Sequence, residues 1–125
     1  EDNMKIKISV LSGVELDWAV MHCLRPGNSL EFFLKQRVFP QKAFRYSTDW
    51  GLSGPIMENY DIYPCKYHVC ATSNPNSYQA GVGTAWYQGE TPLIAICRSI
   101  VATVQNSDEI EIPDELHTYC MQFNS

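Results

Sequence analysis

Polar and apolar residues alternate from Lys5 to Val10, near the start of the chain. Ile6, Ile8 and Val10 fall on one side of this pattern, which predicts a strand with one buried and one exposed face. The next residues, Ser12 to Glu15, have the spacing of a capping box, in which two side chains satisfy the first free N–H groups of a helix. We therefore predict a strand followed directly by a helix.

The helix that begins after Ser12 continues to Leu24 with apolar residues at helical spacing, and Arg25 to Gly27 ends it. Trp18 and His22 fall on the face opposite to the apolar stripe. A tryptophan outside the core stripe needs a cover, and three covers remain open: a partner protein, a ligand, or another part of the same chain. Trp18 is for this reason a candidate binding residue.

Further helices and strands follow from the same reasoning. They are a helix at 30–37 capped by Asn28 or Ser29, a helix of one or two turns at 55–60, strands at 62–71 and 82–88 that pair as an antiparallel hairpin, a helix at 92–106 capped by Thr91, and an edge strand at 110–113. This order predicts a single α+β domain, with a mainly antiparallel sheet and two or three helices packed on one of its faces. The residues from Asp114 onward carry no prediction.

Length and charge limit the class of protein. A chain of 125 residues is long enough for one domain with a core, and no apolar run approaches the roughly 20 residues of a membrane helix. Residues 1–3 precede the first methionine and are interpreted as a tag remnant, which leaves residues 4–125 as the domain. No signal peptide follows Met4, so we expect a cytoplasmic protein without a membrane partner. A net charge of −5, with nine scattered basic residues, argues against a nonspecific nucleic-acid binder.

The five cysteines are an odd number and lie within apolar patterns, which indicates reduced, buried thiols. Cys65, His68 and Cys70 are the best local candidates for a zinc site. On a strand, however, Cys65 points to one face while His68 and Cys70 point to the other. We therefore predict no bound metal and no cofactor.

No catalytic constellation is visible in the sequence. The three histidines lie in unrelated contexts, and the chain has no glycine pattern of the phosphate-binding types. Binding is better supported, since Trp18, Trp50 and Trp86 offer flat surfaces on which a base or another aromatic ring can stack. We predict a binding protein and name no catalytic residue.

The segment from Tyr46 to Pro55 is the strongest candidate for a binding site. It gathers small polar residues, one carboxylate, a tryptophan and two glycines, and glycine lets a backbone approach a ligand closely. Ser53 is the predicted N-cap of the helix that follows, with Pro55 near its first position. Trp50 would form one wall of the site, and the polar residues before it would orient the ligand. In an alternative use, the Asp49 side chain makes a local turn with its own backbone and needs no ligand.

Arg98 is a second candidate, on the flank of the helix predicted at 92–106. Its neighbours Ile94 and Val101 at helical spacing are apolar, so its stem is expected to pack and its guanidinium to be directed. A directed guanidinium suits a phosphate group. The competing reading is a solvated arginine that extends from the side of the helix.

Three segments together resemble the NinX family of small phage proteins, encoded in the Nin region of lambdoid phages and related prophages. They are residues 11–20 (LSGVELDWAV), 47–58 (STDWGLSGPIME) and 91–98 (TPLIAICR), and their order and spacing match the family. The acidic residues at 108–116 are similar too. The chain departs from the family at 26–44, which looks longer than in compact relatives, and at 60–83, where little matches.

The resemblance implies a phage or prophage protein that acts in the cytoplasm of an infected bacterium, with no established activity to carry over. We expect it to bind a small polar or nucleotide-like ligand, such as a nucleotide-derived immune signal of the host, and to form a homo-oligomer. Two alternatives stay open: a module that binds a host protein through a surface including Trp18, and a nucleotide-processing enzyme with Asp49 as general base. The predicted ligand-binding residues, expected to share one pocket, are Asp17, Trp18, Ser47, Thr48, Asp49, Trp50, Gly54 and Arg98.

Overall fold

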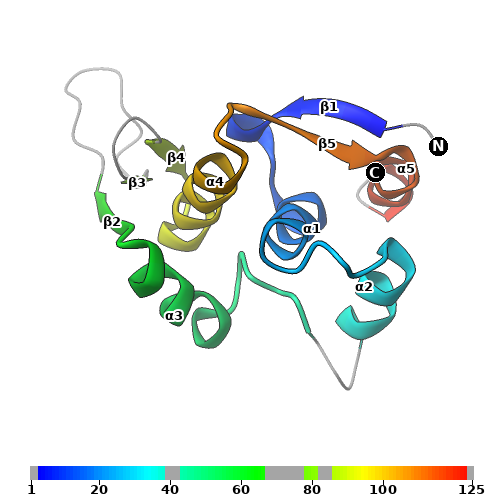
Figure 1. The fold of residues 1–125 in the computed structure, drawn as a ribbon, viewed down its shortest axis with the longest axis horizontal. Helices are drawn as coiled ribbons and strands as arrows, with labels where there is room; N and C mark the ends of the chain where they lie inside the picture. The colour runs from blue at the N-terminus through cyan, green and yellow to red at the C-terminus, as the bar shows by residue number, and fades with distance from the viewer. Residues whose placement is uncertain (1–2, 39–42, 67–77, 82–85, 124–125) are drawn as a thin grey trace.

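The computed structural model describes residues 3–38, 43–66, 78–81 and 86–123, which form a single α+β domain (Figure 1). Its elements are β1 (Asn3–Lys7), η1 (Ile8–Val10), α1 (Gly13–Leu24), α2 (Leu30–Arg37), α3 (Trp50–Tyr60), β2 (Tyr63–Lys66), β3 (Tyr78–Gly81), β4 (Tyr87–Gly89), α4 (Pro92–Gln105), β5 (Glu109–Pro113) and α5 (Asp114–Phe123). Among these residues, no helix is long and apolar enough to cross a membrane.

Helix α4 lies at the centre of the molecule, between the three-stranded sheet and α1 (Figure 1). Its apolar residues cover two faces. Leu93, Ile96 and Ile100 belong to a core that α4 shares with the three-stranded sheet and α3. Cys97 and Val101 belong to a larger core, shared with α1, α2, β5 and α5. One strongly apolar helix thus holds both halves of the domain together, because burying both faces removes them from water.

The strands form two separate antiparallel sheets. β1 pairs with β5, with Ile6 opposite Ile110, and the outer sheet has the order β2-β3-β4. The predicted α+β class and antiparallel pairing are confirmed, but the strands form two sheets and not the single one that was predicted. The reason is the position of α4, which stands between the two sheets and packs against each.

Two of the predicted helices have the expected bounds. Ser29 caps α2 by accepting a hydrogen bond from the N–H of Phe32, and Thr91 caps α4 by accepting one from Ile94. α1 begins where predicted, although its Ser12 side chain makes no capping bond. Local side-chain chemistry was therefore sufficient to place α2 and α4.

The first strand is shorter than predicted. The chain turns into η1 after Lys7, so Ile8 is buried while Val10 is 65% exposed, and the placement of Val10 on the buried face is wrong. The predicted edge strand is confirmed as β5, whereas β3 and α5 were not predicted. The predicted partner of the strand beginning near Tyr63 is also wrong, since β2 pairs with β3, and β3 in turn pairs with β4.

Candidate functional site

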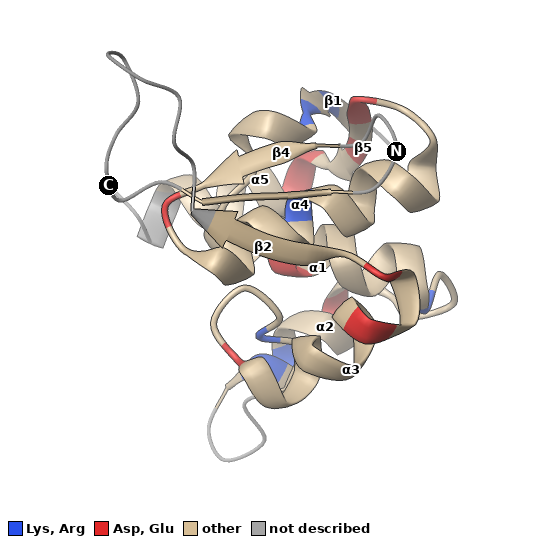
Figure 2. Ribbon diagram, turned by 90° about the vertical axis from the view of Figure 1, so that its left-hand side faces the viewer, with Lys and Arg blue, Asp and Glu red and all other residues tan. Residues whose placement is uncertain are grey.

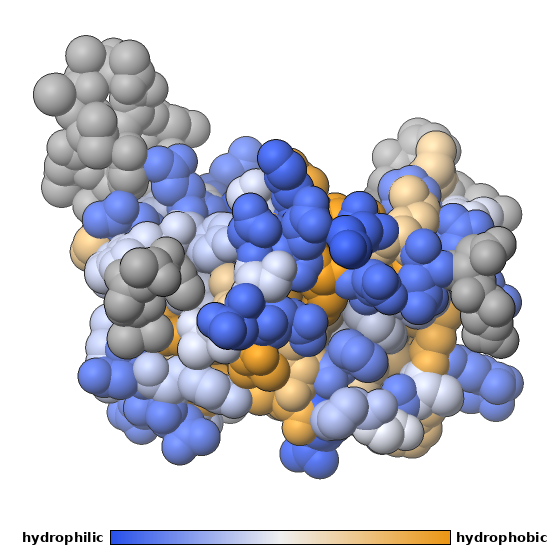
Figure 3. Space-filling model, turned by 45° about the horizontal axis from the view of Figure 1, so that its top comes forward, coloured by the Kyte–Doolittle hydropathy of each residue, from blue (hydrophilic) through white to orange (hydrophobic). Residues whose placement is uncertain are grey.

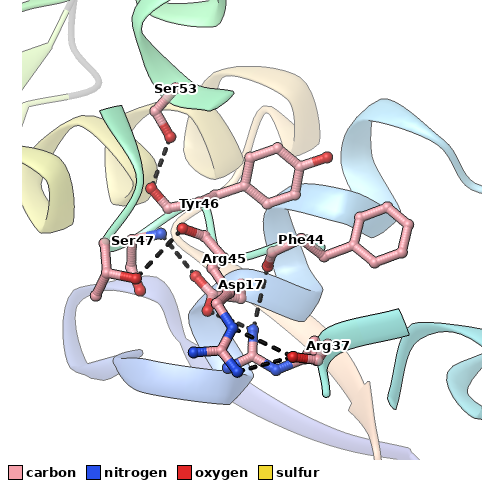
Figure 4. Close-up of polar contacts among 8 residues, drawn as sticks. Asp17, Arg37, Phe44, Arg45, Tyr46, Ser47 and Ser53 are labelled. Carbon is pink, nitrogen blue, oxygen red and sulfur yellow. Dashed lines mark hydrogen bonds and ion pairs between the residues drawn. The ribbon is translucent and has the colours of Figure 1, made fainter. Parts of the chain in front are cut away.

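Asp17 forms the centre of a buried polar cluster beneath the candidate segment (Figure 4). It stands on α1 and is only 2% exposed. Its carboxylate accepts a hydrogen bond from Nη1 of Arg37 at 2.6 Å and another from the backbone N–H of Ser47 at 2.7 Å. We call Asp17, Arg37 and Ser47 the Asp17 lock, because their bonds join α1, α2 and the chain that leads to α3.

Arg37 strengthens this connection through its other contacts. Its Nη1 also donates to the carbonyl of Phe44 at 3.1 Å, and its guanidinium lies over the Phe33 ring at 5.3 Å. Arg45 in turn donates from Nη2 to the carbonyl of Arg37 at 2.7 Å. The sequence pattern gives no sign that Arg37 meets Asp17.

The electrostatics of the cluster follow from its burial. Burial raises the pKa of Asp17, while hydrogen bonds from Ser47 and the charge and bond of Arg37 oppose this rise. Burial also raises the pKa of the neighbouring Cys97 thiol to about 12, with a further contribution from the charge of Asp17. Cys97 is thus an inert thiol packed against the lock, because a raised pKa leaves almost no thiolate at neutral pH.

Ser53 belongs to the inner side of the segment. Its hydroxyl donates to the carbonyl of Tyr46 at 2.6 Å, and its side chain is buried. The prediction that Ser53 caps the following helix is therefore wrong. The cap is Asp49, whose Oδ1 accepts a hydrogen bond from the N–H of Gly51 at 2.8 Å, so that α3 begins at Trp50.

The outer side of the segment is exposed at Thr48, Asp49 and Trp50, which we call the Trp50 platform. The Trp50 side chain is 49% exposed. The Thr48 hydroxyl donates to the carbonyl of Arg45 at 3.4 Å. The Asp49 side chain makes a local turn with its own backbone, which is the predicted alternative that needs no ligand. Gly54 follows within α3, and a methyl group added there would meet no atom within 4 Å.

Trp18 is buried by the protein itself, with 6% exposure, so of the three covers left open by the sequence, another part of the same chain is the one observed. Its ring stacks on His22 at 4.6 Å and 10°, and its Nε1 is buried without a partner in the described part of the chain. The packing around α1 explains this burial. α1 is surrounded by α4, β5 and α5, so residues on both of its faces enter the core.

Arg98 is a link between distant backbone segments. Its Nε donates to the carbonyl of Leu11 at 2.9 Å, and its Nη1 donates to that of Gln88 at 2.6 Å. Of the two alternatives for Arg98, a directed guanidinium and a solvated one, the first is therefore observed. The guanidinium is directed toward η1 and β4. Of the eight predicted residues, Asp17 and Ser47 are joined by a hydrogen bond. Thr48, Asp49 and Trp50 are neighbours exposed on the surface. That all eight residues share one pocket stays a prediction.

A cavity of about 350 Å³ lies elsewhere, where α1 and α4 end beside β1 and β5. Its lining contains none of the predicted site residues; it consists of Lys5, His22, Gln105, Ser107, Glu109, Ile110 and Glu111. The face on which β1 and β5 come forward is mostly hydrophilic, with apolar side chains in patches between (Figure 3). Charges of both signs line this cavity, so it favours no single class of ligand.

The cysteines give no metal site in the described chain, where no group of at least three His, Cys, Asp or Glu residues could hold an ion. Cys97 and Cys120 are buried free thiols, as predicted, but Cys23 is only half-buried and Cys65 is exposed. His68 and Cys70, the other members of the zinc candidate, lie outside the described residues.

Comparison with known proteins gives one match. No curated protein and no solved structure matches the chain. A family model, described as NinX of bacteriophage P22, matches residues 7–104, a range that contains the Asp17 lock, the Trp50 platform and Arg98. Since this match covers most of the 125 residues, the chain belongs to the bacteriophage P22 NinX family.

Proposed function

We propose that this phage protein is an accessory protein that works by binding a small nucleotide-like ligand, whose base stacks on Trp50. The observation that supports this is the half-exposed Trp50 ring, which stands beside the exposed polar residues Thr48 and Asp49. A large aromatic side chain left in water gives a planar ligand a surface for stacking, and each stacked base typically contributes about 1–3 kcal/mol.

The platform is held from beneath, which favours binding. The Ser47 N–H is fixed by Asp17, the Tyr46 carbonyl by Ser53, and the first turn of α3 by the Asp49 side chain. A surface that is already ordered loses little conformational freedom when a ligand arrives. The lock therefore has a functional consequence in this proposal, because it holds the backbone that leads to Trp50.

The chemistry of the platform favours the base of a nucleotide over its phosphate. A carboxylate accepts hydrogen bonds, and Asp49 stands next to the ring, so amino and imino groups of a base fit here. Arg98, the predicted phosphate ligand, already binds two backbone carbonyls. The net charge of −5 also repels a phosphate-rich ligand. The role that we propose for such a phage protein is sequestration of a nucleotide-derived immune signal of the host, with the base rather than the phosphates as the group that is recognised.

The other hypotheses are less well supported. A surface that binds a host protein through Trp18 conflicts with the burial of that residue. An enzyme with Asp49 as general base is favoured by no contact of that carboxylate among the described residues, where it caps α3. We therefore favour binding without turnover.

Calorimetry against nucleosides, mononucleotides, cyclic dinucleotides and NAD-derived cyclic nucleotides tests the proposed function. Trp50→Ala is expected to weaken binding roughly 5- to 150-fold, which corresponds to the loss of one stacked base. The free energy of unfolding should change by no more than about 0.5 kcal/mol, as is usual for an exposed side chain. Met121→Ala, which removes an exposed side chain from α5, is the matched control. Absence of binding by the whole panel would overturn the proposal.

A further inference from the structure

The cavity of about 350 Å³ lies along the edge of a strand. Three of its lining residues, Glu109, Ile110 and Glu111, are consecutive in β5. Neighbouring residues in a strand point to opposite faces of the sheet, so a cavity that contacts three in a row follows the edge of that strand. The opposite wall comes from the ends of α1 and α4, through His22 and Gln105. The cavity is thus bounded by a strand edge and by helix ends.

β5 has no strand partner on this side. Among the described residues, the sheet consists of β1 and β5 alone, and β5 runs between β1 and α1 (Figure 1). The N–H of Ile8 donates to the carbonyl of Asp108 at 2.9 Å, and only every second pair of an antiparallel ladder makes such bonds. Glu109 and Glu111 fall at the other pairs. Their backbone N–H and carbonyl groups therefore point away from β1, along the edge that borders the cavity.

Two observations agree with this direction. Pro113, which is two positions beyond Glu111, has no N–H to give to β1. The Glu109 N–H donates to the hydroxyl of Ser107 at 3.1 Å, and Ser107 also lines the cavity. The Glu109 carbonyl and the N–H and carbonyl of Glu111 bind no second strand in the described part of the chain.

An added antiparallel strand can use all three of these groups. One residue of such a strand would exchange two hydrogen bonds with Glu111, and the residue two positions further would donate its N–H to the Glu109 carbonyl. Proteins bind extended peptides at open sheet edges in this way. The mixed charges of the lining name no ligand class, but a strand edge recognises the peptide backbone itself.

The side chains at this edge favour a basic peptide. Directly paired residues share a face, so the two peptide residues bonded to β5 would stand beside the carboxylates of Glu111 and Glu109. Neither carboxylate takes part in the ion pairs found among the described residues. Lys5 lies opposite Glu111 on the β1 side, and Figure 2 shows blue and red segments next to each other where β1 and β5 pair. A net charge of −5 also attracts a basic partner.

The helix wall of the cavity favours an uncharged residue between the two basic ones. That residue would point to the opposite face of the sheet, the face of Ile110. Burial lowers the pKa of His22, so its ring is neutral at pH 7, and this ring stacks on Trp18. Gln105 donates from Nε2 to the Cys23 sulfur at 3.5 Å. This wall is therefore uncharged and held by contacts of its own.

We propose that the open edge of β5 binds an extended peptide of another protein, which joins the sheet as a third, antiparallel strand with basic residues beside Glu109 and Glu111. This site goes beyond the proposed function, because it belongs to other elements than the Trp50 platform and takes a peptide instead of a nucleotide.

NMR titration of the isotopically labelled protein with a capped peptide of alternating lysine and threonine tests the site. The amide signals of residues 109–111 should shift. A peptide with glutamate in place of lysine should bind on the order of tenfold more weakly, because like charges then face each other. Backbone N-methylation of the lysines, whose N–H groups would bond to β5, should abolish binding. N-methylation of the threonines, whose N–H groups would point away, should preserve it.

Variants of the protein test the same edge from the other side. Glu111→Pro removes an N–H that faces the cavity and should weaken binding on the order of tenfold. Lys7→Pro is the matched control, because it removes an N–H at the opposite edge of the sheet, at a φ of −68° that proline adopts. It should leave binding unchanged. The double variant Glu109→Gln with Glu111→Gln should weaken binding roughly 2- to 30-fold. Thermal melts check each fold, and the N-methylated peptides keep the test usable if Glu111→Pro fails to fold.

The outcomes separate this site from the proposed function. Peptide binding that is weakened by Glu111→Pro, kept in Lys7→Pro and unchanged in Trp50→Ala supports the β5 edge. Equal binding of the two N-methylated peptides, or signal shifts only outside residues 109–111, overturns it. Wild-type dimers that are lost in Glu111→Pro would assign the edge to a second copy and also overturn it. Protein that binds nucleotides but no peptide overturns this site alone, and protein that binds the peptide but no nucleotide overturns only the proposed function.

Discussion

The inner and outer sides of the segment between Phe44 and Ser53 carry similar residues with different uses. On the inner side, Ser47 and Ser53 are buried, and their polar groups bind Asp17 and the Tyr46 carbonyl. On the outer side, Asp49 and Trp50 are exposed, and the Asp49 side chain accepts a hydrogen bond from the Gly51 N–H of its own turn. A segment rich in polar and aromatic residues thus contains residues that stabilise the fold and residues that face solvent. Only their burial and their hydrogen-bond partners distinguish the two kinds.

Removal of Asp17 should have the largest effect on this inner side. Asp17→Ala leaves the Arg37 guanidinium without its carboxylate and the Ser47 N–H without its acceptor, so we expect a loss of about 3–5 kcal/mol in the free energy of unfolding. Urea denaturation measures this loss. Asp49→Ala is the matched control, because it removes an exposed carboxylate that acts as a helix cap and should cost about 1 kcal/mol. Equal losses in the two variants would contradict the division into an inner and an outer side.

Arg98 sharpens the comparison, since its sequence context was compatible with a ligand contact. Arg98→Ala should cost about 2–3 kcal/mol, because two charged hydrogen bonds are lost and the carbonyl of buried Leu11 loses its donor. Thermal unfolding measures the change. Arg98→Lys should recover only part of it, since an ammonium lacks the fork that reaches two carbonyls. Unchanged stability combined with lost ligand binding would assign Arg98 to the outer, functional group.

Cys97 gives a smaller effect that depends on pH. Its pKa is raised to about 12 in the folded protein, against 9.0 for an ordinary cysteine. Above pH 9 the unfolded chain loses this proton first, so the stability that is fully present below pH 9 falls by roughly 1.4 kcal/mol per pH unit. Between pH 9 and 10.5 the decrease should therefore be about 2 kcal/mol larger in wild type than in Cys97→Ala. Parallel pH profiles for the two proteins would show that Cys97 is not buried against the lock.

Much of the fold could be predicted from the sequence wherever the signal is local. Ser29 and Thr91 cap their helices through residues three positions away, and both helices have the expected bounds. At α3 two residues of capping type, Asp49 and Ser53, compete. Local chemistry does not decide between them, because the outcome depends on the Tyr46 carbonyl that takes the Ser53 hydroxyl.

The rest depended on contacts between distant residues. Arg37 meets Asp17 across 20 positions, and no pattern in the sequence pairs them. The sequence left open what covers Trp18, because its neighbours at helical spacing define another stripe, and only the fold shows that α1 is covered on both sides. α5 does carry a local signal, since Asp114 and Glu115 follow a proline and precede Leu116 and Cys120 at helical spacing.

The pairing of β1 with β5 has a consequence for how the protein is made. Lys7 pairs with Glu109, and Asn3 with Pro113, so the first strand finds its partner only in the last part of this sequence. During synthesis β1 must wait until residues 109–113 have emerged before its backbone can pair, whereas α1 and α2 can form as soon as they emerge. Contacts so distant in sequence are slow to form, and an unpaired strand can join a wrong neighbour meanwhile. The closing of this small sheet is thus expected to come after the helices between its two strands have formed.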